Sequence, residues 1–324
     1  QASDFLMALQ LTGAAKSDSV ANLNIRLPVV VIGGGLTAID TATEALAYYV
    51  KQVEKFLVRH EKLAANGGVD ADWSKEEQGF AEEFLQHGKA IRDERQAAAK
   101  EDRLPNFAPL LDSWGGATIA YRRRLIDAPS YTLNHEEITK AFEQGINFAE
   151  MVSPVAIDVD DHGHAQAIKL EVQELDEHNR PNATGHVISL PARSILIAAG
   201  TQPNTVIARE YPGFADLDGK YFQAEDEDGN IVSPEWSAKP EEAQVTMKVT
   251  ENGHSITFFG DLHPSFAGNV VKAMASARRG YPVINRQLVK NPPSPVSASN
   301  LVEQLDHGLR ARVVDVIRLT PNIV

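Results

Sequence analysis

The arrangement of apolar and polar positions near the start of the chain predicts a strand, a glycine turn and a long helix. Val29 to Ile32 is an apolar run of strand length, and it breaks into three glycines. The apolar residues from Ile39 to Leu57 are then spaced alternately four and three apart, which keeps one seam on a single helix face. We expect this helix to continue to about His60.

A second, highly charged helix follows and pairs with the first. Two glycines end the long helix, and Ser74 and Glu77 form the Ser-x-x-Glu capping box that begins the next one, which runs to about Glu101. We therefore expect an antiparallel helical arm at about residues 51–114. Its charged face is either solvated or docks a partner, and the sequence leaves both interpretations open.

The remaining sequence alternates between strand and helix patterns. The expected elements are a short helix at Asp4–Leu11, a buried strand at Ala117–Tyr121, a helix closed by Gly145, strands within 167–177 and 186–200, a β-hairpin turning at Asn252-Gly253, and a helix between Gly268 and Gly280. This order predicts an α/β fold. A proline- and serine-rich linker at about 290–299 precedes the C-terminal segment.

Composition and charge narrow the classes of function. A net charge of −13 disfavours contact with phosphate backbones, so we expect no nucleic-acid partner. The absence of cysteine excludes a disulfide, a cysteine-ligated cluster and a thiol nucleophile from this chain. No apolar run reaches the roughly 20 residues of a membrane span, and we expect a cytoplasmic protein without a membrane partner. Because the chain starts at Gln1 and stops at Val324 within a strand-like run, we expect it to be part of a longer protein.

The glycine turn has the spacing of a dinucleotide-binding motif, Gly33-x-Gly35-x-x-Ala38. The first glycine allows the tight turn, the second lets a pyrophosphate approach the backbone, and the small third residue lets helix and strand pack closely. Phosphates would meet the backbone of Leu36 and Thr37 at the positive end of the helix. The alternative is a glycine turn that joins strand and helix without binding a nucleotide.

The end of the next strand indicates which dinucleotide would bind. NAD-binding proteins place an acidic residue there to bind the ribose hydroxyls, whereas this strand ends in Tyr121 followed by three arginines. Guanidinium groups suit a 2′-phosphate, so Arg122 and Arg123 favour NADP(H). This interpretation requires the strand at 117–121 to lie beside the strand at 29–32. Otherwise the arginines are an ordinary solvated turn.

Two acidic segments were considered as metal sites and set aside. Residues 224–235 nearly fit a calcium loop, but Ala224 stands at the first ligand position and Pro234 interrupts the loop. Residues 158–164 combine three aspartates with His162 and His164, and a polar hairpin turn explains them better. We therefore expect no metal site.

Four segments, taken in order, resemble the two-dinucleotide flavoproteins of the pyridine nucleotide-disulfide oxidoreductase superfamily. They are VVVIGGGLTAIDTATEA, YRRRLIDAPSYTLNHEEITKAFEQGINF, SILIAAGTQPN and FFGDLHPSFAGNVVKAMASARRG. Within it, the sequence is most similar to the small subunit of NADPH-dependent glutamate synthase and the matching module of dihydropyrimidine dehydrogenase. The resemblance covers residues 1 to about 287 apart from the arm. It implies a Rossmann-like NADP(H)-binding domain of three-layer β/β/α character, inserted into a partial FAD-binding domain.

The resemblance also implies domain boundaries and cofactor contacts. Residues 1–24 and 205–290 would belong to the FAD-binding domain, 25–204 to the NADP(H)-binding domain, and 291–324 to a linker and the start of a following domain. The implied cofactor-binding residues are Gly33, Gly35, Leu36, Thr37, Ala38, Arg122 and Arg123 for NADP(H), Gly200 where the last strand crosses close to both cofactors, and Gly260, Asp261, Asn269 and Val270 for FAD.

Together these features predict a module that passes hydride from NADPH to FAD and electrons onward to acceptors outside the chain. Because the cofactors perform this chemistry, we name no catalytic side chain. The family's own FAD-pyrophosphate motif would lie upstream of Gln1, so a missing upstream segment and a downstream electron-transfer domain are the expected partners, and the fragment alone is expected not to be fully active. A stand-alone NADP-dependent dehydrogenase and a non-catalytic module that docks through the arm are the alternatives.

Overall fold

The computed structural model describes residues 1–68, 73–200, 202–237, 239–268, 270–290 and 297–315, and the chain divides into two compact units, Gln1–Thr201 and Gln202–Val324. The first unit is built on a sheet of four parallel strands in the order β3-β2-β1-β7. Their bounds are Val29–Ile32 (β1), Ala117–Ala120 (β2), Ile146–Ala149 (β3) and Ser194–Ile197 (β7).

Both faces of this parallel sheet are covered. Val29 and Val31 of β1 face the helices, whereas Val30 and Ile32 pack against a second, antiparallel sheet. Burial on both sides explains why β1 is apolar at every position. The second sheet has the order β4-β5-β6, with bounds Val152–Val159 (β4), Ala165–Leu175 (β5) and Pro181–Pro191 (β6).

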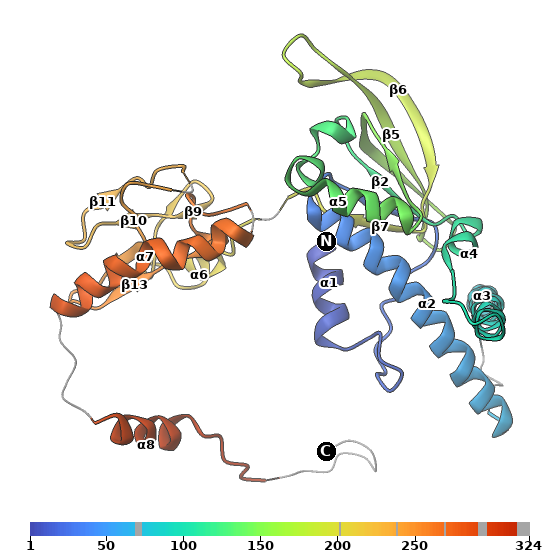
Figure 1. Cartoon of the computed structure of the whole chain (residues 1–324), viewed down its shortest axis with the longest axis horizontal. Helices are drawn as coiled ribbons and strands as arrows, with labels where there is room; N and C mark the ends of the chain where they lie inside the picture. Colours follow the sequence, from blue (N-terminus) through green and yellow to red (C-terminus); the bar gives the residue numbers. More distant parts are fainter. Residues whose placement is uncertain (69–72, 201, 238, 269, 291–296, 316–324) are drawn as a thin grey trace. The chain divides into compact units, whose positions relative to one another are not determined.

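Helices complete the first unit and give it the predicted three-layer β/β/α arrangement (Figure 1). They are α1 (Ala2–Leu11), α2 (Leu36–Ala65), α3 (Lys75–Lys100), α4 (Ala108–Ser113) and α5 (Pro129–Glu143). A 3-10 turn, η1, occupies Leu125–Asp127. Helix α1 contacts α2, and Phe5 meets Tyr48 edge to face with 6.4 Å between ring centroids. The assignment of residues 1–24 to an FAD-binding domain stays a prediction.

The predicted helical arm is confirmed as the far half of α2 together with α3 (Figure 1). Ser74 caps α3 through the expected box: Glu77 N–H donates to Ser74 Oγ, and Ser74 N–H donates to Glu77 Oε2. Gly88 of α3 lies so close to α2 that a Cβ there would stand 2.8 Å from the carbonyl oxygen of Val53. The two helices are therefore in backbone-to-backbone contact at this point.

The second unit has a small antiparallel sheet and one long helix. Strands β10 to β13 form the order β11-β10-β12-β13, and β8 pairs with β9. The expected hairpin at Asn252-Gly253 is confirmed as β12 and β13. The bounds are α6 (Val206–Glu210), β8 (Leu217–Asp218), β9 (Tyr221–Phe222), β10 (Ala224–Glu225), β11 (Ile231–Val232), β12 (Thr246–Val249), β13 (Ser255–Thr257), the 3-10 turn η2 (Gly260–Leu262), α7 (Val270–Lys290) and α8 (Ala298–Leu309).

The prediction that Gly280 ends its helix is wrong. Helix α7 continues to Lys290, with Pro282 inside it. Gly280 is buried, and a Cβ there would stand 2.5 Å from the ring of Phe259. This glycine therefore lets α7 pack closely against Phe259 and Val245, which lie just outside β13 and β12, and it does not end the helix. The greater part of the expected linker, residues 291–296, lies outside the described residues.

Candidate functional site

The glycine turn lies at the carboxyl end of β1, between its two neighbouring strands. Gly33 N–H donates to the carbonyl oxygen of Ala120 at 3.1 Å, which extends the pairing of β1 with β2 by one residue. At its φ of +149°, a Cβ on Gly33 would stand 2.3 Å from the carbonyl oxygen of Ala198. Only a residue without a side chain fits where the chain passes between β2 and the end of β7.

The next two glycines differ sharply in their surroundings. Gly34 is enclosed: a Cβ there would stand 2.5 Å from the ring of Tyr121, and its carbonyl oxygen accepts hydrogen bonds from Ser130 N at 3.0 Å and Ser130 Oγ at 2.9 Å. Gly35 is open, because a Cβ there would meet no described atom within 4 Å. Space for a ligand therefore exists beside the second motif glycine and not beside the residue before it.

The first turn of α2 offers the N–H groups of Leu36 and Thr37 as donors, whereas that of Ala38 donates to the carbonyl oxygen of Gly35 at 2.9 Å. Gly35 is the N-cap residue, and no side chain caps the helix. The first N–H groups of a helix have no partner within it and carry partial positive charge, which suits an anion such as a phosphate. Leu36 and Thr37 are half-buried, whereas Ala38 is fully buried against the sheet, as the motif requires of its small third residue.

The predicted arginines follow the neighbouring strand. Strand β2 runs parallel to β1 with Ala120 opposite Ile32, so the condition set by the sequence is met. Arg124 is occupied by Asp127 through bonds of 2.7 and 3.0 Å, and this pairing lowers the pKa of the Asp127 carboxyl. Within the described residues, Arg122 and Arg123 form no ion pair. Two cationic side chains thus remain available beside the turn.

Ser130 is a functional candidate that the sequence analysis missed. Its two hydrogen bonds to Gly34 fasten the start of α5 to the turn, although 96 residues separate the two positions. No sequence signal marks this contact, because a serine near a helix start is common for other reasons. Ser130 holds the backbone of the turn and leaves the N-terminus of α2 free.

The remaining predicted cofactor residues are distributed over both units. In the first unit, Gly200 follows β7 with a φ of +104° and is exposed. In the second unit, Gly260 N–H donates to Ser276 Oγ at 3.0 Å, and Asp261 Oδ1 accepts from Gly268 N at 3.1 Å. One oxygen of the Asp261 carboxylate is thus used within its own loop. Val270 begins α7 and is exposed, and Asn269 lies outside the described residues.

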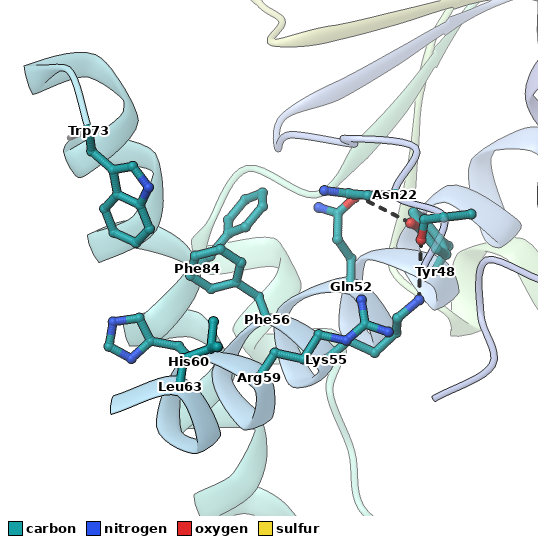
Figure 2. Close-up of a pocket in the computed structure, with 11 residues that line it drawn as sticks. Asn22, Tyr48, Gln52, Lys55, Phe56, Arg59, His60, Leu63, Trp73 and Phe84 are labelled. Carbon is teal, nitrogen blue, oxygen red and sulfur yellow. Dashed lines mark hydrogen bonds between the residues drawn. The ribbon is translucent and has the colours of Figure 1, made fainter. Parts of the chain in front are cut away.

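A separate apolar pocket lies in the helical arm (Figure 2). Its volume is about 230 Å³, and its floor carries the rings of Phe56, His60, Trp73 and Phe84. At 1.5 Å per residue, it begins roughly 18 Å along α2 from the glycine turn. Its polar residues fasten the segment before β1 to α2. Tyr48 Oη accepts from Leu23 N at 2.9 Å, and the Gln52 amide forms hydrogen bonds with both the N–H and the carbonyl oxygen of Ile25. Lys55 donates to the carbonyl oxygens of Ala14 and Ala21. Arg59 donates to the carbonyl oxygens of Ser17 and Ser19. We assign this pocket a structural role.

Comparison with known proteins shows similarity to a protein of Rickettsia prowazekii. No protein-family model matches the chain. The uncharacterized protein RP006 of Rickettsia prowazekii is 33% identical over 324 residues, a match that covers 96% of this chain and 38% of that protein. The chain therefore spans well under half the length of this relative. Among the described helices, none combines the length and apolar character that crossing a bilayer requires.

Solved structures give weaker likenesses. Thioredoxin reductase of Lactococcus lactis is 16% identical with a TM-score of 0.39, covering 81% of this chain and 53% of that one. FprA of Mycobacterium tuberculosis, solved in complex with NADPH, is 14% identical with a TM-score of 0.39, covering 86% and 58%. Likenesses at TM-scores this low support no conclusion about the chain, whose α/β architecture is established by its own strand order and layers.

Proposed function

We propose that the first unit binds NADP(H) at the carboxyl ends of β1 and β2. The observation that carries the proposal is the open Gly35 at an uncapped helix N-terminus, beside two arginines that form no ion pair within the described residues. The pyrophosphate would lie against the first turn of α2. Arg122 and Arg123 would bind the 2′-phosphate through charge-assisted hydrogen bonds.

We further propose that the chain is the NADPH-oxidising module of a larger flavoprotein related to the glutamate synthase small subunit. FAD would supply the two-electron acceptor chemistry when bound. This chain's contribution would be Gly260 and Asp261, whose carboxylate could accept hydrogen bonds from hydroxyl groups of the cofactor. The rest of the FAD site and the later electron acceptor would come from segments or subunits outside residues 1–324, in keeping with the greater length of the Rickettsia relative.

Arg122→Ala and Arg123→Ala are each expected to weaken NADPH binding roughly 10- to 100-fold, because each removes a hydrogen bond between charged groups. Binding of NADH, which lacks the 2′-phosphate, should change less than about threefold. Isothermal titration of the purified chain with both nucleotides measures the two effects.

Arg124→Ala is the matched control for this experiment. It removes the same charge from the same loop, but its guanidinium is already bound to Asp127, so NADPH affinity should stay within about threefold of the wild type. Equal affinity of the wild type for NADH and NADPH would refute the assignment of the 2′-phosphate site. An equal loss of NADPH affinity in all three variants would show that the arginines act through their net positive charge and not through specific contacts with the 2′-phosphate.

An absorbance spectrum separates the flavoprotein proposal from its alternatives. Because part of the FAD site lies outside the chain, we expect little bound flavin in the isolated chain and a flavin spectrum in the longer protein. A longer protein that binds NADPH without flavin would support a stand-alone dehydrogenase. A chain that binds neither nucleotide would support a docking module instead.

A further inference from the structure

A cluster of metal-binding side chains lies where the helical arm meets the antiparallel sheet. Glu76 lies in the first turn of α3, and Asp160 and His164 lie in the turn between β4 and β5. One ligand atom from each of the three residues lies within 4.8 Å of the other two. The sequence suggested only the turn residues, and the structure adds a carboxylate from a helix 84 residues away from Asp160.

The contact between Glu76 and His164 is not a hydrogen bond. His164 Nδ1 lies 2.7 Å from Glu76 Oε1 and 3.7 Å from Asp160 Oδ2. Yet Glu76 Oε1 is shielded from solvent and has no hydrogen-bond partner among the described residues. The two side chains are close enough for an ion pair, yet a buried carboxylate oxygen that accepts no hydrogen bond is costly. A cation held between these atoms would satisfy the oxygen and the ring nitrogen together.

The turn holds Asp160 ready for such a role. Asp160 Oδ1 accepts the backbone N–H groups of His162 at 3.0 Å and His164 at 2.8 Å, which leaves Oδ2 on the side of the His164 ring. His162 Nδ1 lies 3.1 Å from Glu76 Oε2, the oxygen that the His164 contact does not use. Carboxylate ligands of metals are commonly oriented by a neighbouring polar group of this kind. His162 is therefore a positioning residue.

Neighbouring charges do not fill the place of a cation. The Arg26 guanidinium stacks over the Phe80 ring, 3.7 Å from its centroid, and lies 3.9 Å from Glu83. It interacts electrostatically with Asp160 and Glu76, but among the described residues it forms no ion pair within 4 Å with either. Lys75 borders the adjoining cavity and forms no ion pair within the described part of the chain. The two carboxylates of the cluster match the charge of a divalent ion when His164 is neutral.

We propose that Glu76, Asp160 and His164 bind one divalent transition-metal ion, with water completing the coordination. Imidazole with carboxylates suits Zn²⁺ or Co²⁺ better than Mg²⁺ or Ca²⁺, which prefer oxygen ligands alone. With one ligand atom of each residue within 4.8 Å of the others, the three side chains could bind one ion at the roughly 2.0–2.2 Å of Zn–N and Zn–O bonds. The ion would fasten α3 to the β4–β5 turn, independently of any nucleotide.

Titration of the untagged, chelator-treated chain with ZnCl₂ and CoCl₂ tests this proposal. We expect one equivalent to bind with a micromolar or lower Kd, Co²⁺ to give visible d–d absorption bands, and Zn²⁺ to raise the Tm. Glu76→Gln and His164→Ala should each weaken binding at least about 10-fold, and His162→Ala about 10-fold through loss of orientation.

His178→Ala and Asp161→Asn are the matched controls, because both change exposed turn residues outside the cluster. Their metal affinity should equal that of the wild type. Circular dichroism without metal identifies any variant that fails to fold, and Asp160→Asn is then the substitute. No binding by the wild type, or equal binding by Glu76→Gln and His164→Ala, would overturn the site.

Discussion

Gly33→Ala is expected to lower the free energy of unfolding by about 2–4 kcal/mol. The added Cβ would stand 2.3 Å from a backbone oxygen, that of Ala198, which no side-chain rotation can relieve. The φ of +149° adds strain for any residue with a side chain. Strand β7 would have to shift away from β1, or the turn would have to change its path. Urea unfolding followed by far-UV circular dichroism measures the loss.

Gly35→Ala tests the proposed contact with the ligand in a variant whose fold should be unchanged. Its φ of −90° is ordinary, and the added methyl group meets open space, so stability should change by less than about 1 kcal/mol. NADPH binding should nevertheless weaken by about 10-fold, because the methyl group occupies the proposed path of the pyrophosphate. Unchanged stability in Gly33→Ala would show that the passage between β2 and β7 is looser than described. Unchanged binding in Gly35→Ala would place the phosphates elsewhere.

The local features of the glycine turn could be predicted from the sequence because each depends on neighbouring residues. A four-residue apolar run, a glycine motif and a helical seam are adjacent in the chain, and the structure confirms all three. The pairing of β2 with β1 was a condition of the NADP(H) interpretation, and the structure meets it although the arm separates the two strands in the sequence. Both strands are short, apolar and followed by turn residues, which is typical of central parallel strands.

Contacts between distant segments could not be predicted in this way. The buried position of Gly280 depends on the ring of Phe259, and the same glycine would be an ordinary helix end if that ring were absent. Ser130 meets Gly34, and Glu76 meets His164, only because the sheets bring α5 and α3 to those places. By themselves, the histidines and aspartates of the β4–β5 turn are typical of a solvated hairpin. The fold places the Glu76 carboxylate of the arm beside them. The chemical type of each side chain can be read from the sequence, whereas the topology of the fold decides which side chains from distant segments meet.

Acidification from pH 6.5 to pH 4 is expected to lower the free energy of unfolding by roughly 2–3 kcal/mol through one residue, His87. Its side chain is buried between α2 and α3, stacked on Trp114 with 3.8 Å between ring centroids. Burial lowers the pKa of His87 to about 4. The hydroxyl of Tyr49 lies 2.6 Å from His87 Nδ1, and burial raises the pKa of this phenol, so it stays protonated and forms a hydrogen bond with the neutral ring.

The sign of this effect follows from the two pKa values of His87. In the unfolded chain the ring takes up its proton near pH 6.5, but in the folded protein it does so only near pH 4. The unfolded state therefore binds more protons between these values, and the stabilisation present above pH 6.5 is lost as the pH falls. Carboxylates and the buried His263, whose pKa burial also lowers, contribute to the same acid range. The wild-type curve alone cannot isolate His87.

The difference in the free energy of unfolding between the wild type and a His87 variant isolates the contribution of His87. His87→Gln keeps a polar group of similar size that does not titrate, so it should be less stable than the wild type at pH 7.5, where the histidine packs in its neutral form. The gap should narrow by roughly 2–3 kcal/mol by pH 4, because only the wild type must protonate or expose a buried ring. His178→Gln removes an exposed histidine and should run parallel to the wild type throughout. A constant gap between His87→Gln and the wild type from pH 7.5 to pH 4 would show that His87 is reached by solvent, and that the arm opens more readily than its packing against Trp114 implies.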